Sequence, residues 1–430
     1  MYQQRPVRWR PLLVPALLTT VAYVDPGNFG SNIEAGSTHG YALLWVVVAA
    51  SIAAAVIQYL AALLGLATGG TLASLSAERM SRPLRLLAWA QAEVVVVMTD
   101  LAELIGGALG LYLLFGVPLP LGAVVVGALS ILILLIGRRA TTISAPVTLA
   151  LLAIVAITVV LVAMSVGARP GVPAGLVPGS LDASGLVLVT AIVGATVMPH
   201  ALYFHSAVSA DARHGGREAT PAALVPERTA AEVPGGRRDP VAAPVRRHLG
   251  ADPRRRLGWS VVIAMGVAGC VNSSLLVLGA NLPAGTSGIE SAHAALAATA
   301  GQVTAVLFGV ALLASGLAST VVGVFTGQVV MSGYIRRPMG LWLRRLIAIA
   351  PPLVILAFGV DATMALVVSQ AVLALALPVT LVPLLALTMS PQVMGALRPG
   401  LVVRAAAVTA TALITVMDVA LIALLVTGRL

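Results

Sequence analysis

The sequence predicts an all-α polytopic membrane protein, and three observations support this fold class. The 430 residues are 59% hydrophobic and 10% charged, with a mean hydropathy of +1.00, whereas soluble domains are about 45–50% apolar and about 25% charged. Apolar stretches of roughly 20 residues, the length of a membrane-spanning helix, recur along the whole chain. They lack the alternating pattern of a membrane β-barrel.

We predict eleven spans from these stretches and from the charged or turn-forming segments between them. In chain order the spans are 12–37, 41–66, 86–114, 120–137, 144–167, 185–208, 258–281, 301–333, 345–360, 363–388 and 402–428. The first span follows "RPVRWR", as the apolar part of a secretory signal would. It passes into Asp25 and Asn28 without a cleavage site, so we expect it to be retained as a helix.

The arginines predict the orientation of these spans. The chain has no lysine, and with the N-terminus in the cytoplasm 24 of its 26 arginines fall on the cytoplasmic side, Arg169 and Arg429 being the exceptions. This asymmetry is the positive-inside pattern of a multi-pass protein of the cell (plasma) membrane, with an extracytoplasmic C-terminus. The net charge of +10 is therefore explained by topology, and we expect no nucleic-acid partner. The single cysteine, Cys270, permits no internal disulfide.

Two of the predicted helices contain residues that break a helix. The first carries "DPGN" at 25–28, and the sixth carries "GATVMPHALYFH" at 194–205. Eleven spans divide into five, five and one, so these are the first helices of two halves, 1–167 and 185–388, followed by a last span at 402–428. Broken helices at matching places in two halves indicate the inverted repeats and the substrate site of a secondary transporter.

The two prolines free backbone carbonyls at the breaks. Pro26 cannot donate a hydrogen bond to the carbonyl of Ala22, and Pro199 cannot donate one to the carbonyl of Ala195. Free carbonyls in hydrocarbon cost several kcal/mol unless they are satisfied or line a cavity. We therefore expect the two breaks to face each other and to bind a cation.

The side chains at the breaks indicate which cation. Asp25 offers a charged oxygen, Asn28 and the Ala195 carbonyl offer neutral oxygens, and Met198 offers a thioether. Hard Mg²⁺ and Ca²⁺ do not favour a thioether, whereas Mn²⁺, Fe²⁺ and softer divalent ions accept it. The pattern favours a transition-metal substrate.

"DPGN" together with "MPH" resembles the Nramp family of divalent-metal transporters, which includes bacterial manganese importers of the MntH type. The segments "WAQAEVVVVMTDLAELIGGALGL", "LLASGLAST" and "SQAVLALALP" also resemble the family. The resemblance implies a LeuT-like fold with inverted repeats of five helices. It also implies that Gln370 joins Asp25, Asn28, the Ala195 carbonyl and Met198 as a metal ligand, that Asn272 is a further polar position near the site, and that metal entry is coupled to protons.

Three carboxylates in the third span, Glu93, Asp100 and Glu103, lie broadly on one helix face. Ionisable groups inside spans are functional by default, so this row predicts either a proton relay or a structural network with arginines. The resemblance implies that Asp100 and Glu103 belong to a proton pathway near Arg344 and Arg345.

Histidines at the sixth span suit the same role. His200 follows the second break directly, and a histidine near the membrane midplane suits proton coupling. His205 is five residues further on and is equally consistent with a satisfied interior histidine.

Other polar and small residues receive weaker predictions. Glu34 either attracts cations at the outer vestibule or is a solvated carboxylate, and we assign no role to His39, Glu290 or His293 in the outer loops. Small residues over 312–327 predict close helix packing. Residues 209–257, rich in Pro, Gly, Ala and Arg, predict a disordered cytoplasmic linker that is atypical of the family.

These observations predict a proton-coupled secondary transporter that imports Mn²⁺ or Fe²⁺ by alternating access. A related Mg²⁺ transporter is an alternative that Met198 disfavours, and an amino-acid:cation symporter of the same fold is one that Asp25 disfavours by repelling a substrate carboxylate. There is no P-loop for an ATP-driven pump. We expect no enzymatic activity and no cofactor, with the metal ion as substrate and H⁺ as coupling ion, and a monomer in the lipid bilayer.

Overall fold

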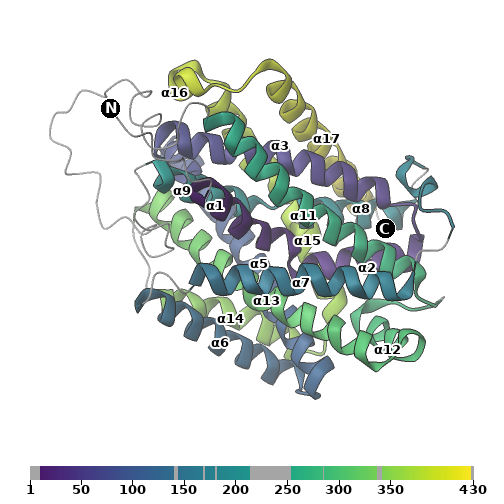
Figure 1. Cartoon of the computed structure of the whole chain (residues 1–430). Helices are drawn as coiled ribbons and strands as arrows, with labels where there is room; N and C mark the ends of the chain where they lie inside the picture. Colours follow the sequence, from purple (N-terminus) through teal and green to yellow (C-terminus); the bar gives the residue numbers. More distant parts are fainter. Residues whose placement is uncertain are drawn as a thin grey trace, which may run out of the picture.

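The structure is a computed structural model that describes residues 10–139, 144–167, 170–179, 182–213, 253–283, 285–336 and 341–427. Over these residues the regular structure is entirely helical, and the long helices run alongside one another in one bundle (Figure 1). The prediction of a disordered linker at 209–257 falls mostly outside the described residues. At its two ends the prediction is wrong, because the chain is helical up to Arg213 and again from Pro253.

The first half of the chain contains α1 (Arg10–Thr20), the 3₁₀ turn η1 (Val21–Val24), α2 (Pro26–His39), α3 (Leu44–Thr68), α4 (Leu72–Ala77), α5 (Arg82–Phe115), α6 (Leu119–Arg139), α7 (Ser144–Val166) and η2 (Ala174–Leu176). The second half contains α8 (Ala183–Thr196), α9 (Pro199–Arg213), α11 (Pro253–Asn281), α12 (Gly288–Ala300), α13 (Gln302–Val330), the π turn η4 (Met331–Ile335), α14 (Leu341–Ala357), α15 (Ala362–Met389), α16 (Pro391–Met394), η5 (Gly395–Leu397) and α17 (Leu401–Val426).

Every predicted span coincides with helix. In the described part of the chain, eight helices are long and apolar enough to cross a membrane: 44–68, 82–115, 146–166, 183–213, 253–281, 302–335, 362–389 and 401–426. The other three predicted spans coincide with the shorter apolar helices 12–24, 119–132 and 346–357. The first of these is short because the break at Asp25 separates α1 from α2, as the sequence predicts.

The helix α12 was not predicted. It lies between two spans, at the end of the bundle opposite the start of α1 (Figure 1). Its thirteen residues are mostly alanine and other small residues, so no apolar stretch of spanning length marks it. Gly288 at its start and Gly301 just after its end have positive φ angles of 81° and 90°, which favour glycine.

The two broken segments form the centre of the bundle. The apolar window of 183–213 is 89% buried, whereas that of 401–426 is 22% buried, so the sixth predicted span is interior and the last one peripheral. Helix α13 packs along α5 and α7, α3 along α9, α11 along α2, and α15 along α8. Each break is therefore enclosed by helices from the other half of the chain.

Candidate functional site

The first break is held open by its own carboxylate. Asp25 is extended (φ −80°, ψ 169°) and caps the N-terminus of α2. Its Oδ1 accepts hydrogen bonds from the backbone N–H of Asn28 at 2.9 Å and from the Asn28 Nδ2 at 2.8 Å. Pro26 occupies the first helical position, where its missing N–H costs nothing. The "DPGN" sequence thus ends one helix and starts the next, with an aspartate at the N-cap and a proline at the first helical position, where each is favoured.

Asn28 joins the two breaks. Its Nδ2 donates to Asp25 Oδ1 and also, over 3.0 Å, to the backbone oxygen of Ala195 in the last turn of α8. The Ala195 carbonyl is the one that Pro199 was predicted to free. The predicted meeting of Asp25, Asn28 and the Ala195 carbonyl is therefore observed, across 167 residues of sequence.

Gln370 of α15 lies against both breaks. A Cβ on Gly27 would clash with the Gln370 side-chain amide, and a Cβ on Gly194 would clash with the Gln370 backbone oxygen. Glycine at these two positions lets α2 and α8 approach α15 closely. The Gln370 Nε2 donates to Ser369 Oγ at 3.2 Å. The predicted fourth side chain therefore lies beside Gly27, the residue between Pro26 and Asn28 in sequence.

The site is buried and contains several oxygen atoms without a hydrogen-bond partner. Asp25, Asn28, Met198 and Gln370 are all 0% exposed. Asp25 Oδ2, Asn28 Oδ1 and Gln370 Oε1 are buried without a hydrogen-bond partner, and buried acceptors of this kind are costly unless a ligand or water satisfies them. Met198 lies in the non-helical link between Thr196 and Pro199. These atom types fit a divalent cation that accepts oxygen and sulfur ligands.

No cluster of three or more His, Cys, Asp or Glu residues suited to a metal occurs in the described part of the chain. The site described above instead combines one carboxylate, Asp25, with the Asn28 amide and the Ala195 carbonyl.

Two further residues bind the carbonyls of the first break. Asn272 Nδ2 of α11 donates to the Tyr23 backbone oxygen at 3.1 Å, and Ser315 Oγ of α13 donates to the Val24 backbone oxygen at 2.6 Å. Asn272 was predicted to be near the site, but Ser315 was assigned to packing alone. The only signal for Ser315 in the sequence is that a hydroxyl stands among the small residues of 312–327.

Asp100 and Glu103 of α5 lie together against α13. A Cβ built on Gly323 would lie 2.9 Å from Glu103 Oε1 and 3.3 Å from Asp100 Oδ1. Both carboxylates are buried, with exposed fractions of 2% and 0%. The structure therefore brings this predicted pair together, next to a helix backbone that offers no side chain at the point of contact.

Glu93 forms an ion pair with Arg344 of α14. Arg344 contacts Glu93 Oε2 at 2.8 Å and Oε1 at 3.4 Å, and Trp89 Nε1 donates to Oε1 at 3.2 Å. Of the two interpretations of the row of carboxylates, the structural network with an arginine is the one that describes Glu93. The Arg345 side chain lies outside the described residues.

His200 lies beside α5. Its Nδ1 is 3.1 Å from Thr99 Oγ1. The Thr99 hydroxyl also lies 3.0 Å from the Val95 backbone oxygen, to which it can donate, and in that arrangement Nδ1 is the nitrogen that donates to Thr99. The His200 Nε2 is buried without a partner, as are both ring nitrogens of His205. The prediction that His205 is a satisfied interior histidine is therefore not met by any hydrogen bond of its ring.

Glu34 is half-buried and has a partner in the bundle. Its Oε2 accepts a hydrogen bond from the backbone N–H of Gly288 at 3.0 Å. Next to it, Thr363 Oγ1 of α15 accepts one from the N–H of Ile289 at 2.9 Å. These two bonds attach the N-terminus of α12 to α2 and α15.

Comparisons with known proteins show which family this chain resembles over nearly its whole length. Residues 16–424 match the family model described as natural resistance-associated macrophage protein-like, Nramp. The divalent metal cation transporter MntH of Mycobacterium tuberculosis H37Rv is 43% identical over 389 residues, covering 89% of this chain and 84% of the relative. A crystal structure of the Eremococcus coleocola manganese transporter is 31% identical with a TM-score of 0.74, covering 95% of this chain and 85% of that one.

A more distant structure has the same fold. The nucleobase-cation-symport-1 family transporter Mhp1 aligns with a TM-score of 0.57 at 13% identity, covering 97% of this chain and 93% of Mhp1. At this identity the likeness concerns the fold alone.

Proposed function

Because this chain belongs to the Nramp family, we propose that it imports Mn²⁺ or Fe²⁺ into the cytoplasm, with protons as the coupling ions. Membership is supported by the family match over nearly the whole chain and by the MntH relatives, which are named divalent metal cation transporters. These findings support metal ion transport by a multi-pass membrane protein. We propose in addition which metal it carries, that protons are coupled to its uptake, and how the transport works.

The Asn28 contacts carry the proposal. One side chain bonds the carboxylate of the first break and the freed carbonyl of the second. When a metal ion enters, Asp25 Oδ2, Asn28 Oδ1 and Gln370 Oε1 are the buried oxygens available to it. The Ala195 carbonyl and the Met198 thioether complete the proposed ligand set. The thioether is the group that would favour a transition metal over Mg²⁺ and Ca²⁺.

Alternating access is the proposed mechanism. The two breaks divide each broken helix into halves that can tilt separately, so the halves on one face of the membrane can open while those on the other stay closed. We infer an orientation with the N-terminus in the cytoplasm from the arginines, which places the C-terminal end of α2 and the start of α8 at the outer face. We also infer that the protein works as a monomer in the cell membrane.

The proposed proton pathway starts at the metal site and continues along α5. Its members are Asp25, His200, Asp100, Glu103, Arg344 and Arg345. His200 offers an unpartnered Nε2, and its Nδ1 contacts Thr99, the neighbour of Asp100 in sequence. The Asp100 and Glu103 pair follows on the same helix. Arg344, paired with Glu93, is a fixed positive charge near the far end of this row.

Uptake into proteoliposomes tests the function. We expect the wild type to take up Mn²⁺ and Fe²⁺ in preference to Mg²⁺ and Ca²⁺, with inward movement of protons. Asp25→Ala is expected to abolish uptake, and Met198→Ala to keep uptake but lose the discrimination. Met394→Ala, which removes a buried methionine of α16, is the control for loss of packing. Normal uptake by Asp25→Ala, or unchanged selectivity in Met198→Ala, would show that these residues do not hold the ion.

A further inference from the structure

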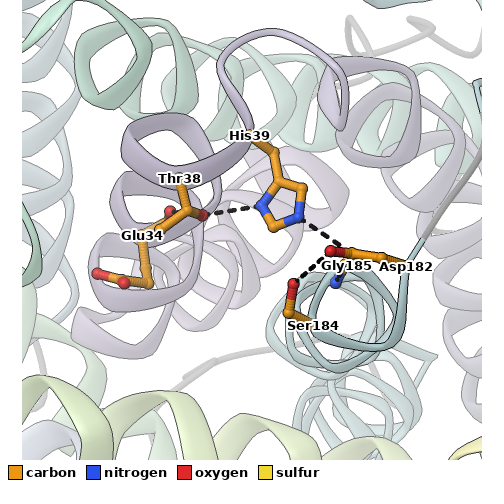
Figure 2. Close-up of polar contacts among 6 residues, drawn as sticks. All are labelled: Glu34, Thr38, His39, Asp182, Ser184 and Gly185. Carbon is orange, nitrogen blue, oxygen red and sulfur yellow. Dashed lines mark hydrogen bonds and ion pairs between the residues drawn. The ribbon is translucent and has the colours of Figure 1, made fainter. Parts of the chain in front are cut away.

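A histidine links the far ends of the two broken helices. His39 is the last residue of α2, and Asp182 is the N-cap of α8. The His39 Nε2 lies 3.3 Å from Asp182 Oδ1, and its Nδ1 lies 2.8 Å from Thr38 Oγ1. Figure 2 shows the ring between the two helices, with Thr38 on one side and Asp182 on the other.

Counting donors identifies the charged form of this ring as the better fit. The Thr38 hydroxyl is 2.6 Å from the Glu34 backbone oxygen, to which it donates. It can then only accept from His39 Nδ1, while an ionised Asp182 can only accept from Nε2. All these contacts form together when both ring nitrogens carry protons. In the neutral ring with its proton on Nε2, the hydrogen bond to Asp182 remains but the charge of the ion pair is lost, and the Thr38 hydroxyl can donate either to the Glu34 backbone oxygen or to His39 Nδ1 but not to both.

Asp182 is built to stay ionised. Its Oδ1 accepts from the backbone N–H of Gly185 at 2.7 Å, and its Oδ2 accepts from Ser184 Oγ at 2.9 Å. These two hydrogen bonds, followed by the contact with His39, hold the pKa of Asp182 below its ordinary value. The N-terminus of a helix also favours a negative charge. The partner of His39 is therefore negative over the whole range in which histidines change charge.

Other titratable groups stand at this end of the bundle. The elements packed against α2 bring Glu34 of α2 itself, Glu290 and His293 of α12, Tyr112 of α5 and Asp361 at the start of α15, together with Tyr41 after α2. Glu34 accepts from Gly288, Asp361 accepts from the N–H of Met364, and Tyr41 donates to Asn281. Among the described residues, Asp182 is the acidic group that contacts this ring, at 3.3 Å.

We propose that His39 is a proton-binding site that, when charged, ties the end of α2 to the start of α8 and favours closure of the outer face. The inference rests on the proposed function for the meaning of "outer" and of closure. Closure describes this structure, since the ligand residues are 0% exposed and α12 is attached to α2 and α15 at the same end. External acid would thus hold the outer halves of both broken helices together.

Hydrogen–deuterium exchange of the full-length protein in lipid nanodiscs tests the link without any transport. After correction for the intrinsic dependence of exchange on pH, we expect amides of the last turn of α2 and the first turn of α8 to be about 1.5- to 5-fold better protected at pH 5.5 than at pH 8 in the wild type. That range corresponds to exposed ion pairs. His39→Gln and Asp182→Asn should each abolish the difference. Asparagine still caps a helix, so Asp182→Asn removes the charge and keeps the cap.

His293→Gln, on α12 of the same face, is the matched control and should keep the wild-type difference. A pH-dependent protection that survives both His39→Gln and Asp182→Asn overturns the proposal. Protection that is equal at the two pH values in the wild type overturns it as well.

Uptake then tests the consequence of the link for transport. With the interior buffered at one pH, the ratio of Mn²⁺ uptake by His39→Gln to that by the wild type should rise about 1.5- to 5-fold as external pH falls from 8 to 5.5. A flat ratio contradicts the link to closure. A wild type that carries no Mn²⁺ would refute the proposed function, whereas the exchange result would still decide whether the proton-dependent link exists.

Discussion

Ser315→Ala tests whether a hydrogen bond from α13 stabilises the non-helical backbone at the break between α1 and α2. Ser315 Oγ donates to the Val24 backbone oxygen at 2.6 Å, from a position 291 residues away in sequence. Both groups are buried, with exposed fractions of 2% each. Alanine removes the donor and leaves the carbonyl without its partner, one residue before the proposed ligand Asp25.

The expected energetic cost of Ser315→Ala follows from the burial and the length of this hydrogen bond. A buried acceptor that loses its donor costs about 1–3 kcal/mol, and side-chain hydrogen bonds between membrane helices contribute about 0.6–2 kcal/mol. The bond here is short and fully buried, so we expect about 1–2 kcal/mol. If this energy favours the broken, binding-competent shape, Mn²⁺ affinity should weaken by about 5- to 30-fold.

The assay is calorimetric titration of Mn²⁺ into the purified protein in detergent, together with its melting temperature. Ser319→Ala is the matched control, because Ser319 is a buried serine one turn further along α13 whose Oγ bonds its own helix, at the Ser315 backbone oxygen over 2.9 Å. We expect wild-type affinity in Ser319→Ala. Equal Mn²⁺ affinities in the wild type and both variants would refute the idea that Ser315 stabilises the non-helical backbone at the first break.

Three other changes follow from the structure. Gly323→Ala places a methyl group 2.9 Å from a Glu103 oxygen, so we expect proton influx during Mn²⁺ uptake to fall about threefold to tenfold. Gly266→Ala is the control and should leave proton influx unchanged, because an added Cβ there meets no atom within 4 Å. Asp182 has a lowered pKa, so its stabilising effect is complete above the ordinary aspartate value of about 3.9 and is lost as the pH falls through the lower folded value. The melting temperature of Asp182→Asn should consequently fall less steeply below about pH 4 than that of the wild type, and equal slopes would contradict this. Glu93→Gln removes the charge that pairs with the largely buried Arg344, so the free energy of unfolding should drop by about 2 kcal/mol. Denaturant titration in mixed micelles measures this change, and an unchanged free energy of unfolding would mean that the ion pair contributes nothing to stability.

The sequence predicted the spans and the breaks because their causes are local. A proline cannot donate a backbone hydrogen bond wherever it stands in a helix, but proline alone does not predict a break, since Pro378 and Pro383 stand inside the continuous helix α15. Pro26 and Pro199 indicate breaks because polar residues accompany them in the sequence. The neighbouring residues Asp25 and Asn28 are polar, and the energetic cost of polarity in a membrane indicates function. The helix α12 could not be predicted in the same way, because it is short, rich in alanine and attached through Glu34 and Thr363 from other elements.

The hydrogen-bond partner of a side chain on another helix could be predicted only where the resemblance to a known family implied it. No local pattern distinguishes Ser315, which bonds Val24, from Ser319, which bonds its own helix. His39 has the same difficulty, since its partner Asp182 lies 143 residues away at the start of another helix. A residue type and its spacing indicate what chemistry a side chain can perform. They do not indicate which group faces it, and for these residues the partner decides the role.

The position of α13 explains why small residues there do more than pack helices. Along one helix, Ser315 bonds the first break, Gly323 faces the carboxylates of α5, and Thr326 Oγ1 lies 3.3 Å from the His200 backbone oxygen, next to the second break. A Cβ on Gly327 would clash with the Arg344 guanidinium. Any tilt of α13 must therefore act on both breaks and on the proposed proton pathway together. We expect metal and proton steps to be coupled through this helix, so that Ser315→Ala and Gly323→Ala, two turns apart, give non-additive losses of uptake when combined.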